Sequence, residues 1–133
     1  MQTATRSSSG SIVTYLKAGL IAGVVAAVIA NIYYFIYEQV TGNTFAELNL
    51  GSITGASVLP GLVGGLILYA LHRFTSRGTQ IFVIGGALFT IVSIVPTIVA
   101  PLYPNFFWAS APLHIIVGAV LLALIPRLAA TSR

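Results

Sequence analysis

The sequence predicts an all-α fold, a bundle of four transmembrane helices with the N- and C-termini in the cytoplasm. Four apolar stretches of about 20 residues carry no charged side chain, and a helix of that length crosses the hydrocarbon core of a bilayer. Charged residues make up 6% of the 133 residues, against about 25% in a soluble domain. This number of charges is too small to cover the surface of a soluble protein. We therefore expect the lipid bilayer to surround the chain.

The charged residues avoid the apolar stretches and are sorted by sign along the chain. The cations are Arg6, Lys17, Arg73, Arg77, Arg127 and Arg133, and the acids are Glu38 and Glu47. Because the chain changes side at each predicted span, every cation lies in segments on one side of the membrane. Both acids lie in the segment on the other side. Because cytoplasmic loops are enriched in Lys and Arg, both termini and the turn at Arg77 are predicted to be cytoplasmic. The cations form no clustered patch, which argues against nucleic-acid binding.

The first stretch, residues 18–37, is predicted to be a helix because a helix satisfies its own backbone hydrogen bonds inside lipid. A signal peptide is the alternative, with Lys17 before the apolar run and a cleavage site at Val28-x-Ala30. The apolar run continues to Tyr37, beyond the core of a signal peptide, which favours a membrane span.

Three further helices follow, separated by short polar segments. They are predicted at residues 53–71, 81–100 and 106–125. Residues 1–11 are rich in Ser, Thr and Gly and are predicted to form a flexible cytoplasmic tail. Residues 12–130 then form a single four-helix membrane domain.

Small residues recur at four-residue spacing in these helices. The glycines predicted to pack helices together are Gly19, Gly23, Gly61, Gly65 and Gly118. In lipid, small residues allow helix backbones to approach closely. The stripes are interpreted first as packing within one bundle, and second as a face for a homo-oligomer or another membrane protein.

Polar groups and prolines share one layer in the outer half of the membrane. The candidate ligand-binding residues of this layer are Asn31, His114, Ser57, Ser93, Thr97 and Ser110. Prolines free backbone carbonyls within a helix, and Ser or Thr hydroxyls are expected to bind these carbonyls. The layer is therefore either a satisfied polar layer that holds the helices in register, or an outward-facing cavity with Asn31 and His114 as ligand contacts.

The residue inventory excludes most chemistry. There is no cysteine, and no metal-ligand spacing, GxSxG or phosphate loop, so no catalytic residue, metal or cofactor is predicted. No acid lies within a span, whereas small multidrug exporters require a carboxylate deep in their first helix. His72 and His114 are about 18 Å apart along the membrane normal, which rules out a haem bound by both within one chain.

Four segments carry a family resemblance. They are AGLIAGVVAAVIAN, ASVLPGLVGGLILYALHRFT, SIVPTI and PLHIIVGAVLLALIPRLA, one in each predicted helix. Over residues 12–130 the chain resembles a family of small bacterial four-helix integral membrane proteins of uncharacterised function. The resemblance implies the fold and the topology, and it carries no activity or functional residue.

The leading hypothesis is a non-enzymatic, multi-pass protein of the bacterial cytoplasmic (inner) membrane, acting as an accessory subunit of a membrane assembly. The alternative is a small transporter or ligand-binding membrane protein that uses the polar layer around Asn31 and His114. A membrane enzyme built around His114 is a third hypothesis, weakened because no acid lies in the layer to orient the histidine.

Overall fold

The computed structural model describes residues 10–131, which form four helices and no strand. The helices are α1 (Ile12–Thr41), α2 (Leu50–Phe74), α3 (Gly78–Val99) and α4 (Phe106–Thr131). Each is long and apolar enough to cross a membrane. The predicted all-α fold with four candidate spans is confirmed.

The helices extend past the predicted spans, most of all in α1. Its 30 residues correspond to about 45 Å, longer than a hydrocarbon core of about 30 Å. The Ser11 side chain accepts a hydrogen bond from the Thr14 N–H, and Gly42 ends the helix in the left-handed region at φ 71°. Apolar side chains mark the part of a helix that suits lipid, whereas caps decide where the helix ends, so the two limits differ. Ser11 belongs to the predicted tail, and residues 1–9 of that tail lie outside the described residues.

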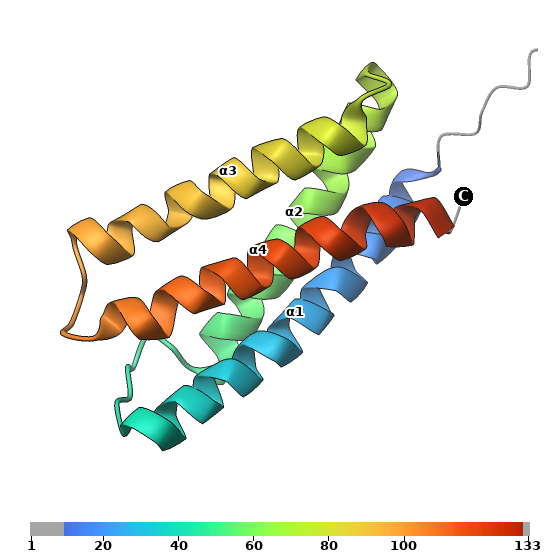
Figure 1. The fold of residues 1–133 in the computed structure, drawn as a ribbon. Helices are drawn as coiled ribbons and strands as arrows, with labels where there is room; N and C mark the ends of the chain where they lie inside the picture. Colours follow the sequence, from blue (N-terminus) through green and yellow to red (C-terminus); the bar gives the residue numbers. More distant parts are fainter. Residues whose placement is uncertain (1–9, 132–133) are drawn as a thin grey trace, which may run out of the picture.

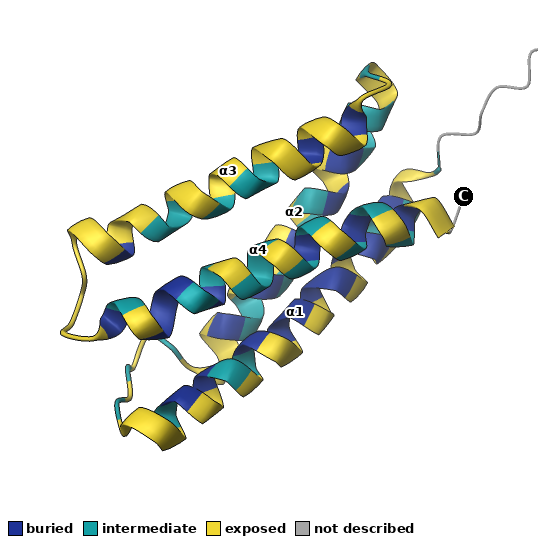
Figure 2. Ribbon diagram, in the orientation of Figure 1, coloured by how far each residue is buried: buried dark blue, intermediate teal, exposed yellow. Residues whose placement is uncertain are grey.

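The four helices differ in how many neighbouring helices they contact and how extensively (Figure 1). α1 packs against α2 and α4, whereas α3 packs against α4 and, less extensively, α2. Within residues 10–131, α1 and α3 make no contact. Figure 2 shows the result, because α3 is exposed along most of its length while the other helices bury continuous faces.

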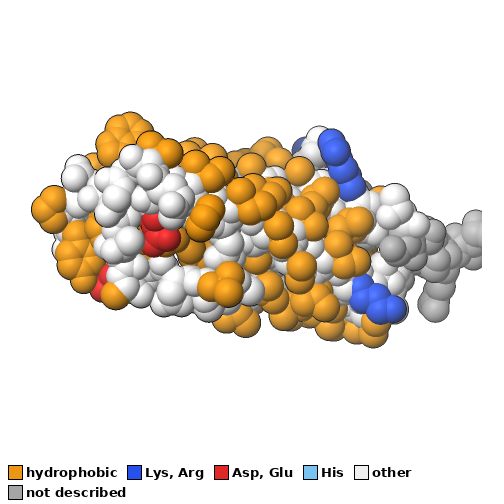
Figure 3. Space-filling view, turned by 90° about the horizontal axis from the view of Figure 1, so that it is seen from below, with side chains coloured by type: hydrophobic (Ala, Val, Ile, Leu, Met, Phe, Trp, Pro, Cys, Tyr) orange, Lys and Arg blue, Asp and Glu red, His pale blue; other side chains and the backbone are white. Residues whose placement is uncertain are grey.

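The charges lie at the two ends of the bundle. We call the end with residues 42–49 and 100–105 the acidic end, because Glu38 and Glu47 lie there. The opposite, basic end carries Lys17, Arg73, Arg77 and Arg127. Figure 3 shows acidic and basic side chains toward opposite ends of one face, with hydrophobic side chains between them.

α1 and α2 approach at the distance of backbone contact. A Cβ atom added to Gly19 would meet the carbonyl oxygen of Gly61, and one added to Gly65 would meet the carbonyl of Tyr15. A Cβ on Gly23 would lie 2.8 Å from the Cα of Val58. Four of the five glycines singled out in the sequence therefore lie between α1 and α2. The fifth, Gly118, faces Thr90 across the α3–α4 contact.

Candidate functional site

A groove lies between α2, α3 and α4, on the side of the bundle away from α1. Its volume is about 1010 Å³. α2 and α3 meet at the basic end, where three residues join them, and diverge toward the acidic end (Figure 1). Residues of α2, α3 and α4 line the space between them, and most of these residues are apolar.

Four residues of the predicted polar layer lie in this groove. They are Ser57 on α2, Ser93 on α3, and Ser110 and His114 on α4. Ser110 and His114 are four residues apart, so they occupy the same face of α4 in successive turns. Three helices therefore place polar groups in one largely apolar cavity.

His114 is held by a hydrogen bond to α3. Its Nδ1 lies 3.1 Å from Ser93 Oγ, and that hydroxyl donates to the carbonyl oxygen of Thr90 at 2.7 Å. The glycine one turn further along α4, Gly118, gives the Thr90 side chain room to approach. His114 is half-buried. The sequence reasoning missed Thr90, because nothing in the sequence indicates which turn of α3 faces α4.

The serine hydroxyls differ in their partners. Ser57 is fully buried, and its Oγ donates to the carbonyl of Ile53 at 2.7 Å. Ser110 is 6% exposed, and its hydroxyl makes no hydrogen bond within the part of the chain that the structure describes. Every buried side-chain nitrogen or oxygen in that part has a partner. Ser110 Oγ is therefore accessible, and Ser110 is one of the residues that line the groove.

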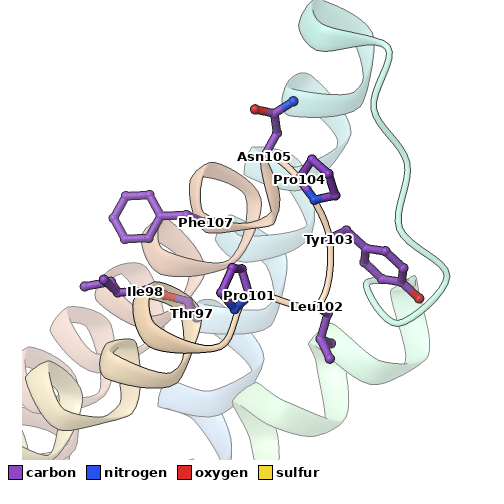
Figure 4. Close-up of a pocket in the computed structure, with 8 residues that line it drawn as sticks. All are labelled: Thr97, Ile98, Pro101, Leu102, Tyr103, Pro104, Asn105 and Phe107. Carbon is purple, nitrogen blue, oxygen red and sulfur yellow. The ribbon is translucent and has the colours of Figure 1, made fainter.

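The remaining two polar-layer residues lie elsewhere. The Asn31 side chain donates to the carbonyl of Ala27 at 2.8 Å and to Thr54 Oγ1 at 3.2 Å, so it links α1 to α2. The structure does not bring Asn31 and His114 into one cavity, because Asn31 lies on the face of α1 that packs against α2. Thr97 lines a separate hollow of about 660 Å³ at the acidic end of α3 (Figure 4).

The hydroxyls do not bind the carbonyls that prolines free. Ser57, Ser93 and Thr97 each donate to a carbonyl three or four residues earlier in their own helix. The carbonyl four residues before Pro112 belongs to Trp108, and the Tyr33 hydroxyl of α1 donates to it at 2.6 Å. A side chain from another helix thus takes the position that the missing proline N–H leaves open.

Two loops contact each other at the acidic end of the bundle, beside the groove. Tyr103 donates from its hydroxyl to Glu47 Oε1 at 2.7 Å, and the Phe45 ring stacks on Tyr103 at 5.7 Å between centroids. The hydrogen bond to the Glu47 carboxylate raises the pKa of Tyr103 above its ordinary value. Glu47 and the adjacent Leu48 also line the groove. Sequence reasoning missed this pair, because 56 residues separate its members.

Charge is distributed asymmetrically around the groove. Among its lining residues in the described chain there is no Lys or Arg, and Glu47 is the charged residue. His72 lies apart at the basic end, where its Nδ1 is 2.7 Å from the Tyr15 hydroxyl and its Nε2 is 2.9 Å from Thr79 Oγ1. These contacts give His72 a role in joining α1, α2 and α3. No cluster of three potential metal-ligating residues occurs among residues 10–131.

Comparison with known proteins identifies one family. A family profile described as a family of unknown function (DUF6069) matches residues 11–131. No curated protein and no solved structure matches the chain.

Proposed function

The chain belongs to the DUF6069 family of unknown function, and we propose that it is a non-enzymatic integral membrane protein that binds a hydrophobic ligand in the groove. The observation that carries this proposal is the convergence of Ser93, Ser110 and His114 in a largely apolar cavity. Ligand sites are typically apolar cavities of about 300–1,000 Å³ with a few polar groups that orient the ligand. An ionisable side chain inside a membrane segment is also a functional candidate by default.

The groove would lie within the lipid bilayer. We propose that the protein lies in the bacterial cytoplasmic membrane with its basic end and both termini facing the cytoplasm, as the positive-inside bias favours. The acidic end then faces outward, and the polar groups of the groove lie in the outer half of the bilayer. A ligand reaches the groove from the lipid, between the diverging ends of α2 and α3.

Blocking the groove tests the function. Gly85 lines the groove, and a Cβ atom there meets nothing within 4 Å. Gly85→Leu should therefore fill the groove without disturbing the packing of the helices. We expect the amount of lipid-like material that co-purifies in mild detergent, measured by mass spectrometry, to fall about tenfold or more, a loss of about 1.4 kcal/mol or more in binding free energy.

Gly55→Leu is the matched control. A Cβ on Gly55 also meets nothing within 4 Å, and Gly55 lies on α2 outside the groove lining. This variant should retain the co-purifying molecule. Equal retention by the two variants, or no bound molecule in the unaltered protein, would contradict the proposed function.

The accessory-subunit hypothesis is the second candidate, and one observation favours it. α3 buries Gly78, Phe82 and Thr97 and leaves most of its other apolar side chains exposed. Gly19, Gly23, Gly61 and Gly65 already pack between α1 and α2, so we expect a partner to contact α3 instead of these glycine stripes. The same purification separates the candidates, because a stoichiometric second protein in place of a lipid would support the accessory role.

A further inference from the structure

We infer that the groove binds a neutral lipid whose polar head is a hydroxyl group, and that His114 Nε2 accepts the hydrogen bond from that hydroxyl. This inference rests on the proposed function and names the class of ligand. It follows from the hydrogen bonds that Ser93 makes with Thr90 and His114, from the Ser110 hydroxyl on α4, and from the distribution of charge.

The Ser93 hydroxyl determines which nitrogen of His114 carries the proton. A serine hydroxyl has a single hydrogen to donate. The carbonyl oxygen of Thr90 can only accept a hydrogen bond. The 2.7 Å contact between Ser93 Oγ and this oxygen therefore uses the serine hydrogen. Ser93 Oγ must then accept at its 3.1 Å contact with His114, which makes Nδ1–H the donor. In a neutral imidazole with Nδ1 protonated, Nε2 is an acceptor.

The Nε2 atom of His114 is accessible, and the ring that carries it belongs to a residue that lines the groove. Within the described residues, the His114 ring makes a single hydrogen bond, from Nδ1 to Ser93. Since no buried side-chain nitrogen in this part of the chain is without a partner, Nε2 has accessible surface. The His114 side chain lines the groove. An acceptor that faces an apolar space gains most from a ligand that donates a hydrogen bond, and ketones, esters and ethers have no hydrogen to donate.

Ser110 complements His114. Its hydroxyl is accessible from the groove for the same reason, and it lies one turn from His114 on α4. A ligand hydroxyl donates one hydrogen bond and accepts others. It can donate to Nε2 and accept from Ser110. A ligand carbonyl could accept from Ser110 but would leave Nε2 without a donor.

The charge of the groove excludes an anionic head. No cation lies among its described lining residues, and Glu47 stands at the acidic end. A phosphate or carboxylate in the groove would lose its hydration without gaining an opposite charge. The ligand head is therefore neutral.

The depth and length of the groove indicate the shape of the ligand. His114 is eight residues into α4, about 12 Å along the helix axis. A phospholipid headgroup stays at the interface, so a hydroxyl at this depth belongs to a lipid with a small head. The lining residues of α2 extend from Ser52 to Leu71, about 29 Å along a helix. A long isoprenoid or alkyl chain can therefore lie along α2 toward the basic end.

A matched pair of probes tests the inference. Geranylgeraniol and its methyl ether have the same chain, but the ether has lost the hydroxyl hydrogen. With the full chain in lipid nanodiscs, we expect the alcohol to bind about tenfold more tightly than the ether. His114→Phe should remove this difference, and His114→Gln, which retains a carbonyl acceptor, should restore part of it.

The outcomes separate the two proposals. If neither probe binds, the proposed function is wrong. If both probes bind equally well, the groove binds lipid but the hydroxyl inference is wrong. Persistence of the alcohol preference in His114→Phe would also overturn the inference, because the hydroxyl would then be recognised elsewhere.

A spectroscopic measurement tests the tautomer of His114 directly in the unaltered protein. The ¹⁵N NMR spectrum of the unaltered protein with labelled histidine distinguishes the two neutral tautomers, and His114→Gln assigns the signals. We expect His114 to be neutral with its proton on Nδ1. A proton on Nε2 would make that atom a donor and overturn the inference.

Discussion

A tyrosine of α1 compensates for a proline of α4. Pro112 has no N–H, so the carbonyl of Trp108 lacks its usual helical donor. The Tyr33 hydroxyl donates to that carbonyl at 2.6 Å and so connects the two helices near the acidic end. This contact shows how a single side chain can make a helix-breaking residue compatible with a membrane span.

Tyr33→Phe should lower the free energy of unfolding by about 1 kcal/mol, because the Trp108 carbonyl loses its donor. Denaturation in detergent micelles, followed by circular dichroism, measures the change. Tyr69→Phe is the matched control, since the Tyr69 hydroxyl accepts from the exposed Arg73 at the basic end. A smaller change for Tyr33→Phe than for Tyr69→Phe would contradict this account.

α1 and α2 form the most extensive helix–helix contact of the bundle. A Cβ atom on Gly61 would meet the carbonyl of Gly19 and lie 3.0 Å from the Cα of Gly23. Backbone atoms on both sides cannot move aside as a flexible side chain can. The approach of the two helices therefore depends on the absence of side chains at these positions.

Gly61→Ala should accordingly lower the free energy of unfolding by about 1–3 kcal/mol, as overpacking does in a close-packed interior. Gly55→Ala, on the same helix with open space around its Cβ, should be neutral or stabilising by up to about 1 kcal/mol, because alanine favours helix more than glycine does. Thermal unfolding of both variants in the same detergent provides the comparison. Equal stabilities would show that the α1–α2 contact is looser than described.

For the whole molecule, the charge asymmetry between the two ends determines how we expect the protein to sit in the membrane. Reporter fusions at Arg77 and at Asn105 should lie on opposite sides, with Arg77 in the cytoplasm. The two positions flank α3, which is long enough to span a bilayer. Fusions reporting the same side for both positions would contradict the four-span topology, and exchanged sides would contradict the orientation alone.

The candidate site was only partly predictable. Hydropathy and proline positions placed Asn31, Ser57 and His114 in one layer, because depth follows from residue number along a helix. The direction in which a side chain points around the helix axis is a separate quantity. It separates Asn31, which binds Thr54 between α1 and α2, from His114, which faces the groove.

The sequence by itself determined the number of helices, their order along the chain and the positions of the charges, because the bilayer selects for apolar length and excludes charge. The tertiary structure decided which helices touch. It placed α1 away from α3, packed the glycine stripes of α1 and α2 into the contact between these helices, and brought Ser93, Ser110 and His114 together. The physical reason is that lipid is as apolar as the helices, so hydropathy does not distinguish one helix face from another. Close packing and hydrogen bonds between helices make that choice.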